Sequence, residues 1–190
     1  MVICSAYSPD GKTYAAGLYN GSINLYETSS WNRMQRLKGR SEGVSSLSFS
    51  ATGGQIASGS GDKTVRMWDV DAGECVHASH GHSSTVWSIV YSPKGDRIAS
   101  GSEDKTVQLW DIDSGECIHI LQGHYGAVQS VVYSPKGDRV ASGSVDKTVV
   151  LWNVETGKRA HTLQGHRYWV RSVVYSPNGD RIASESKDKT

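Results

Sequence analysis

Histidine, serine and aspartate are the residue types of a hydrolytic triad, and this sequence contains them at a regular spacing. His82, Ser100 and Asp104 are followed by Trp110. In such a triad the histidine would act as the base that activates the serine. The set recurs at a constant interval, completely or in part, as Ser58, Asp62 and Trp68, as His124, Ser142, Asp146 and Trp152, and as His166, Ser184 and Asp188. A catalytic site needs one set at one place, so the repetition favours a structural role and argues against an enzyme.

Histidine and cysteine also ligate metals, but their spacing here does not suit a metal site. His77, His119 and His161 are separated by the same interval as the triad-like sets. Equivalent positions in successive repeats fan apart, so we expect solvated side chains there. The three cysteines are odd in number and lack metal-type spacing, which predicts free thiols in a reducing compartment, the cytoplasm. The sequence therefore predicts no metal and no cofactor.

The elements that must position these residues follow the same period. Tyr91 and Tyr133 each open the heptapeptide Tyr-Ser-Pro-Lys-Gly-Asp-Arg, and Tyr175 opens a close variant. The segments 81–122 and 123–164 are identical at more than half of their positions. A fixed period of about 40 residues is the signature of a repeat architecture.

Each repeat reads as short strands separated by turns. In the third repeat we expect strands at 86–91, 97–101, 106–110 and 116–121, the first of them buried on both faces because it is nearly all apolar. Pro and Gly in the segment 92–96 mark the first turn. Four antiparallel strands in every repeat, without helical periodicity, predict an all-β fold, a β-propeller with four-stranded blades.

Two dipeptides in the repeats resemble the signature of the WD-repeat family. Gly81-His82 is followed by Trp110-Asp111, and the next repeat has Gly-His and Trp-Asn at the same positions. The resemblance implies a hydrogen-bonded network in which the turn Asp orients the His, the His bonds the strand Ser, and the Trp indole ends the chain. Arg40 departs from the pattern, because it stands where His is expected. The near-identical tandem repeats are also similar to the repeat arrays of NACHT-type signalling NTPases.

The repeats divide the chain into five units of one partial β-propeller. The first unit is degenerate and the last is shorter, and the units are 1–38, 39–80, 81–122, 123–164 and 165–190. We expect four full blades plus the first two strands of a fifth, an incomplete propeller. The expected context is a segment of a longer propeller, with a second chain that completes the ring as the alternative.

The positions at which the repeats disagree are not scattered. They gather in the loop that enters the inner strand, at the start of that strand, and just before the turn Asp, all of which open on one rim of the disc. We predict that this rim is a partner-binding face formed by Thr85, Trp87, Glu103, Tyr125, Gln129, Val145, Tyr168, Trp169, Arg171 and Lys187. Large amphipathic residues of this kind are enriched in binding hot spots. Neutral drift in exposed loops is the alternative.

The expected function is a non-enzymatic scaffold or sensor module that binds other proteins or peptides. The alternative is a structural subunit that makes contacts through blade edges and outer strands. The net charge of +1 gives no field to hold nucleic acid. Arg167, Arg171 and Lys187 beside aromatic residues favour a nucleic-acid reader only as a minor variant. No apolar run approaches the ~18–20 residues of a membrane helix, so no membrane contact is expected.

Overall fold

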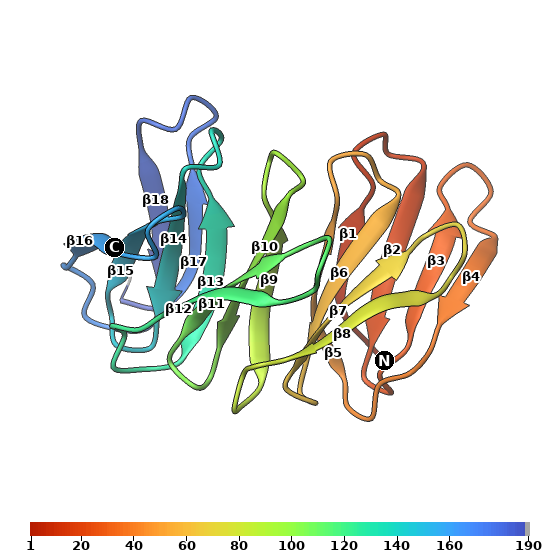
Figure 1. Cartoon of the computed structure of the whole chain (residues 1–190), viewed down its shortest axis with the longest axis horizontal. Coiled ribbons are helices and arrows are strands. Elements are labelled where there is room, and N and C mark those ends of the chain that lie inside the picture. Colours follow the sequence, from red (N-terminus) through yellow and green to blue (C-terminus); the bar gives the residue numbers. More distant parts are fainter. Residues whose placement is uncertain (189–190) are drawn as a thin grey trace.

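The computed structural model describes residues 1–188, which form eighteen strands in a row of packed sheets (Figure 1). The first two sheets contain β1 Val2–Tyr7, β2 Thr13–Leu18, β3 Ile23–Glu27, β4 Arg33–Leu37, β5 Val44–Phe49, β6 Gln55–Ser60, β7 Thr64–Asp69 and β8 Cys75–His80. The remaining strands are β9 Val86–Tyr91, β10 Arg97–Ser102, β11 Val107–Asp111, β12 Cys117–Leu121, β13 Val128–Tyr133, β14 Arg139–Ser144, β15 Val149–Asn153, β16 Arg159–Leu163, β17 Val170–Tyr175 and β18 Ile182–Ser186.

Each group of four consecutive strands forms one antiparallel sheet, and β17 pairs with β18 alone. We call these sheets blades 1 to 5. The first strands of neighbouring blades pack side by side, and blades 1 and 5 lie at opposite ends of an open row (Figure 1). The predicted fold, an incomplete propeller with four-stranded blades, is thus confirmed. No helix within residues 1–188 is long and apolar enough to cross a membrane.

The inner strand of a blade is not buried on both faces, and the prediction for 86–91 was wrong in this respect. In β9, Val86, Ile89 and Tyr91 are buried, whereas Trp87 is exposed and Ser88 is half-buried. An inner strand is the edge of its sheet, so the amides on its free side need partners from elsewhere.

Serines of the preceding blade supply those partners. The backbone N–H of Ile89 donates to Ser46 Oγ at 3.1 Å, and the N–H of Val131 donates to Ser88 Oγ at 3.1 Å. The bond repeats between Val173 and Ser130 at 3.2 Å. Ser88 therefore serves the next blade, which explains a polar residue in an otherwise apolar run.

The core lies between the blades. The seam between blades 3 and 4 is filled by buried side chains from both sheets, including Leu109, Val128 and Trp152. Gly101 lies in the same seam, where a Cβ atom would come within 2.6 Å of Val128 Cγ1. Glycine is required there because the inner strand of the next blade passes so close to the backbone.

Three turns connect the four strands of a complete blade. The first has glycine in the left-handed region, as predicted, for example Gly95 at φ 75°, and so does the third, for example Gly115 at φ 71°. The second, between the second and third strands, has a lysine in that region: Lys63, Lys105 and Lys147 lie at φ 69°, 73° and 74°. A left-handed lysine is uncommon, and the sequence pattern alone did not indicate it.

The outer strands contain the histidines for which we expected solvated side chains. His77 and His119 are instead half-buried, and only His161 is exposed. His119 Nε2 lies 3.1 Å from the carbonyl oxygen of Glu155, in the next blade. A Cβ atom on Gly115, in the matching turn of blade 3, would lie 2.7 Å from the His77 ring. Both side chains therefore pack against a turn of the following blade.

Candidate binding face and its supporting network

A chain of hydrogen bonds crosses blade 3 from a turn to its buried tryptophan. His82 Nδ1 lies 2.7 Å from Asp104 Oδ2, and His82 Nε2 lies 2.7 Å from Ser100 Oγ. The Trp110 indole N–H donates to the same serine oxygen at 2.8 Å. Because a carboxylate only accepts, Nδ1 donates to Asp104, and Nε2 is left to accept from the serine hydroxyl. Every polar atom of this chain therefore has a partner.

Blade 4 repeats the whole arrangement, and blade 5 repeats its aspartate–histidine–serine part. His124 lies 2.7 Å from Asp146 and 2.8 Å from Ser142, and Trp152 donates to Ser142 at 2.8 Å. The equivalent distances in blade 5 are 3.1 Å from His166 Nδ1 to Asp188 Oδ2 and 2.8 Å from His166 Nε2 to Ser184 Oγ.

The electrostatics of the network follow from burial and hydrogen bonding. Burial by itself would raise the pKa of Asp104, but hydrogen bonds from His82 and Thr106 outweigh it and hold that pKa well below its ordinary value. Burial lowers the pKa of His124 despite the opposing effect of Asp146. In blade 4 these shifts favour a neutral His124 beside a charged Asp146.

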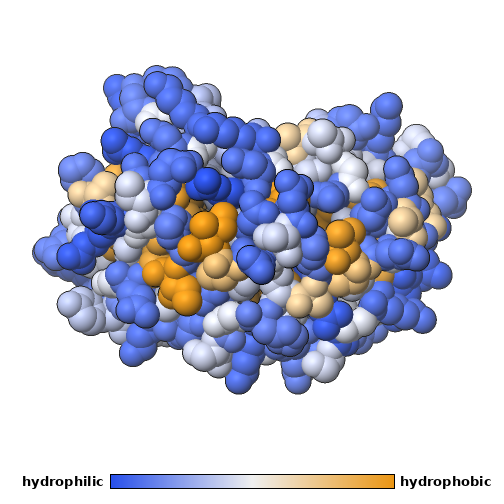
Figure 2. Space-filling view, in the orientation of Figure 1, coloured by the Kyte–Doolittle hydropathy of each residue, from blue (hydrophilic) through white to orange (hydrophobic). Residues whose placement is uncertain are grey.

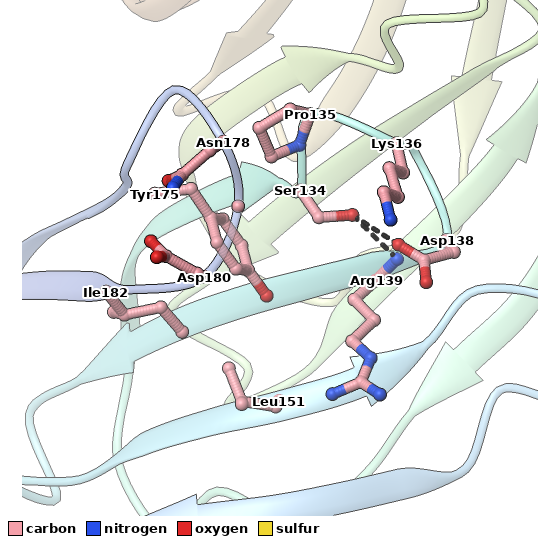
Figure 3. Close-up of a pocket in the computed structure, with 11 residues that line it drawn as sticks. Ser134, Pro135, Lys136, Asp138, Arg139, Leu151, Tyr175, Asn178, Asp180 and Ile182 are labelled. Carbon is pink, nitrogen blue, oxygen red and sulfur yellow. Dashed lines mark hydrogen bonds between the residues drawn. The ribbon is translucent and has the colours of Figure 1, made fainter.

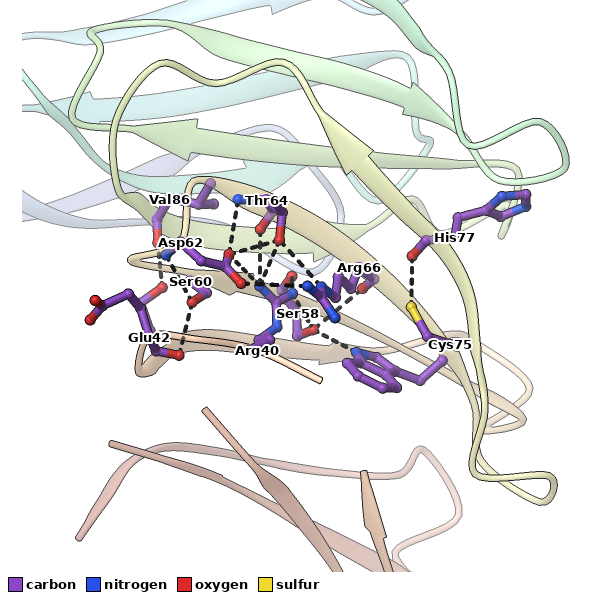
Figure 4. Close-up of polar contacts among 12 residues, drawn as sticks. Arg40, Glu42, Ser58, Ser60, Asp62, Thr64, Arg66, Cys75, His77 and Val86 are labelled. Carbon is purple, nitrogen blue, oxygen red and sulfur yellow. Dashed lines mark hydrogen bonds and ion pairs between the residues drawn. The ribbon is translucent and has the colours of Figure 1, made fainter. Parts of the chain in front are cut away.

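Blade 2 builds the same chain with a different residue (Figure 4). Arg40 is buried and donates through Nη1 to Asp62 at 2.9 Å and through Nη2 to Ser58 Oγ at 2.7 Å. Trp68 donates to Ser58 at 2.7 Å. The guanidinium therefore takes the place of the imidazole. Burial lowers the pKa of Arg40 to about 10, which leaves it charged at neutral pH.

In blades 3 and 4 the serine of the network is closed to a substrate. Ser100 and Ser142 are completely buried, and each hydroxyl oxygen already accepts a tryptophan N–H. A substrate carbonyl could not approach either serine. Among the described residues, no group of three or more His, Cys, Asp or Glu side chains is placed to hold a metal ion.

The network also holds the loop that enters the inner strand. Asp104 Oδ2 accepts the backbone N–H of Ser83 at 3.0 Å, and Asp146 Oδ2 accepts that of Tyr125 at 2.9 Å. Ser102 Oγ donates to the carbonyl of Ser84 at 3.2 Å. These bonds join the loop to the turn between the second and third strands. Ser102 was not among the site residues predicted from the sequence, although serine recurs at this position with the same period.

The ten residues predicted for the binding face occur in these loops, in these turns and at the start of inner strands. The exposed ones are Trp87, Glu103, Tyr125, Tyr168, Trp169, Arg171 and Lys187, and the half-buried ones are Thr85, Gln129 and Val145. Successive strands are antiparallel, so the loop and the turn lie at the same end of each blade. The backbone bond from Glu103 N to Thr85 O, at 2.9 Å, joins them directly. We call this end the rim face.

A cavity of about 400 Å³ lies at the opposite end of blades 4 and 5 (Figure 3). It is bordered by the two Ser-Pro turns and by Leu151, Tyr175 and Ile182. In the seam between blades 2 and 3, Trp110 packs with the residues at the corresponding positions. Between the complete blades, a tryptophan fills the place that corresponds to this cavity. The presence of the cavity therefore follows from packing and does not indicate a ligand site.

The sheets, their seams and the repeated network define a β-propeller made of tandem repeats. The family model for the WD domain, G-beta repeat, matches residues 31–69, 73–111, 115–153 and 157–190. The chain therefore belongs to the WD40-repeat family. WD40 repeats generally mediate protein–protein interaction or scaffolding, and WD40 proteins are typically non-enzymatic. No curated protein matches the chain.

Proposed function

We propose that this chain is a non-enzymatic scaffold or sensor module that binds a protein or peptide on its rim face. The observation that carries the proposal is the contrast between constant and variable positions. The network beneath the rim recurs from blade to blade, whereas the exposed residues above it differ. A rigid support with a variable surface is the arrangement that a binding site requires.

Exposed aromatic residues on the rim support the proposal. Trp87 is 41% exposed, Trp169 is 42% exposed and Tyr125 is 86% exposed. Large apolar surface in contact with water has a free-energy cost that burial against a partner removes. Drift in exposed loops would favour small polar residues instead.

The test is a pull-down with the triple variant Trp87→Ala/Trp169→Ala/Arg171→Ala. We expect partners captured by the native chain to be lost, because the aromatic anchors and one cation of the rim are removed. Quantitative mass spectrometry of the captured proteins provides the measurement.

The matched control for that pull-down is Trp31→Ala/Lys94→Ala/Lys136→Ala, whose three residues are exposed in turns at the other end of the blades. This control should keep the partners. Equal capture by the native chain and by the rim variant would rule out the rim face.

A second function, as a structural subunit, is favoured by the outer strands. Figure 2 shows apolar side chains in separate patches on a mostly hydrophilic surface. Exposed apolar residues of β8, β12 and β16 include Val76, Ile118, Ile120 and Leu163. If assembly uses this surface, Ile118→Lys should abolish association in light scattering while the rim variant has no effect.

A further inference from the structure

The exposed cations of the rim face are concentrated on blades 4 and 5. On blades 2 and 3 the exposed Glu42 and Glu103 accompany one exposed lysine of each rim turn, Lys63 and Lys105, whereas Lys147 of blade 4 has no such glutamate beside it. The rim of blade 5 instead carries Arg167, Arg171 and Lys187, which are also exposed. In the part of the chain that the structure describes, none of these three cations forms an ion pair.

The cations of blade 5 are held at one end of a hairpin. Val170 of β17 pairs with Ser186 of β18, so Arg171 and Lys187 each follow a paired residue. In blade 3 the positions equivalent to Tyr168 and Lys187 are in contact, because Ser84 Oγ donates to Glu103 at 2.8 Å. The aromatic residue and the lysine of blade 5 therefore occupy neighbouring positions.

Aromatic side chains lie beside these cations. The rings of Tyr168 and Trp169 stack with centroids 5.4 Å apart and planes at 21°. Tyr125, on the rim of blade 4, is 86% exposed. Exposed aromatic surface is therefore present on the rims of both blades, where an apolar side chain of a ligand can pack.

We propose that the rim of blades 4 and 5 binds an acidic peptide segment, whose carboxylates pair with Arg171 and Lys187 and whose apolar side chain packs on Tyr125 and Trp169. This proposal rests on the proposed function, because it assigns a partner chemistry to the same rim face. Exposed ion pairs contribute little singly, so the aromatic contacts must supply much of the affinity.

The distribution of charge favours a short acidic peptide over nucleic acid. A long polyanion that followed the rim from blade 5 would reach blades 3 and 2, where Glu103 and Glu42 offset the lysines of the same turns, so it would gain little attraction beyond blade 4. A short acidic segment is long enough for the cations of blades 4 and 5. The net charge of +1 also provides no general attraction for a phosphate backbone.

The experiment measures fluorescence anisotropy with the fluorescein-labelled peptide Glu-Asp-Phe-Glu-Asp-Leu. The neutral analogue Gln-Asn-Phe-Gln-Asn-Leu and a labelled oligothymidylate are titrated in parallel. We expect the acidic peptide to bind more tightly than either, and its affinity to fall as salt rises. Arg171→Glu/Lys187→Glu should weaken binding roughly tenfold or more, since two attractive pairs become repulsive.

The control variant is Lys94→Glu/Lys136→Glu, which changes the net charge equally at the other end of the blades and should bind like the native chain. Circular dichroism must show both variants folded. Equal weakening by both variants, equal affinity for the neutral analogue, or tighter binding of the oligothymidylate would each overturn the proposal. Absence of peptide binding, with partners still lost from the rim variant in the pull-down, would overturn the acidic peptide and leave the proposed function standing.

Discussion

One position in the network is filled by two chemically different side chains. His82 and His124 bridge their serine and aspartate with two ring nitrogens, while Arg40 does so with two guanidinium nitrogens. Arg40 brings a formal charge into the interior, and among residues 1–188 its Nε has no hydrogen-bond partner. A buried ion pair is strongly coupled to its surroundings, because removal of one partner leaves the other charge buried.

Arg40→Met should therefore destabilise the chain by about 3–5 kcal/mol, since Asp62 would lose the cation that compensates its burial. Arg40→His should cost much less, because it restores the bridge of the neighbouring blades. The measurement is the free energy of unfolding in urea. Arg33→Met, at an exposed arginine of β4, provides the control and should change little. Similar losses from Arg40→Met and Arg40→His would contradict the proposed bridging role.

The histidine networks make stability depend on pH. The pKa of folded His124 lies below its ordinary value of 6.5, so the stability it contributes is present above that pH and is lost as pH falls through it. The pKa of Asp146 is also lowered, from 3.8, which removes further stability in more acid solution. We expect the urea midpoint to decline from neutral pH towards pH ~5. His124→Gln should reduce that decline, and an unchanged slope would show that the loss arises elsewhere.

At the scale of the sheet, the seams depend on close backbone approach. Gly59, Gly101 and Gly143 each face the inner strand of the next blade, where a Cβ atom would lie 2.6 to 2.7 Å from a valine methyl carbon. Glu185 occupies the equivalent position of blade 5 and is exposed. The same backbone position thus tolerates a charged side chain when no described sheet packs on it.

Gly101→Glu should accordingly destabilise the chain by about 3 kcal/mol or more, because it overpacks the seam and buries a carboxylate. Glu185→Gly should have little effect. Thermal unfolding of both variants measures the difference. A small shift for Gly101→Glu would mean that the seam opens at low cost.

At the scale of the whole molecule, stability is expected to vary along the row of blades. In a repeat array each unit is stabilised mainly by its neighbours. Strand β10 is almost completely buried, whereas every residue of β16 is exposed and β18 alternates between exposed and half-buried. The middle of the row is therefore better protected than blade 5.

Native-state hydrogen exchange measures this gradient. We expect amides of β10 to exchange most slowly and those of β16 and β18 to exchange fastest. Uniform protection would indicate that all blades unfold together, in a single cooperative step.

Much of the fold could be predicted because its signals are local. Turn residues such as Pro93 and Gly95 fix the ends of strands, and the constant period carries each assignment to the next repeat. The strand at 86–91 was placed correctly, but its burial was not. The need of a sheet edge for serine partners depends on a neighbouring blade, which strand periodicity does not encode.

The candidate site could be predicted only in part. Repetition separated the network from the variable positions, and the structure places those variable positions in connected loops and turns. The clamp from Ser102 to the loop required the strands of one blade to be folded against each other, and the concentration of cations on blades 4 and 5 required the blades to be placed side by side.

The sequence by itself determined the number and order of the strands, the turns and the identity of the repeated polar residues, because these follow from patterns within one repeat. The tertiary structure alone decided that Arg40 bonds both Asp62 and Ser58, that Gly101 must lack a side chain, and that His119 packs on the next blade. Each of these depends on a distance between groups far apart in the chain, and such distances are set by how the sheets pack.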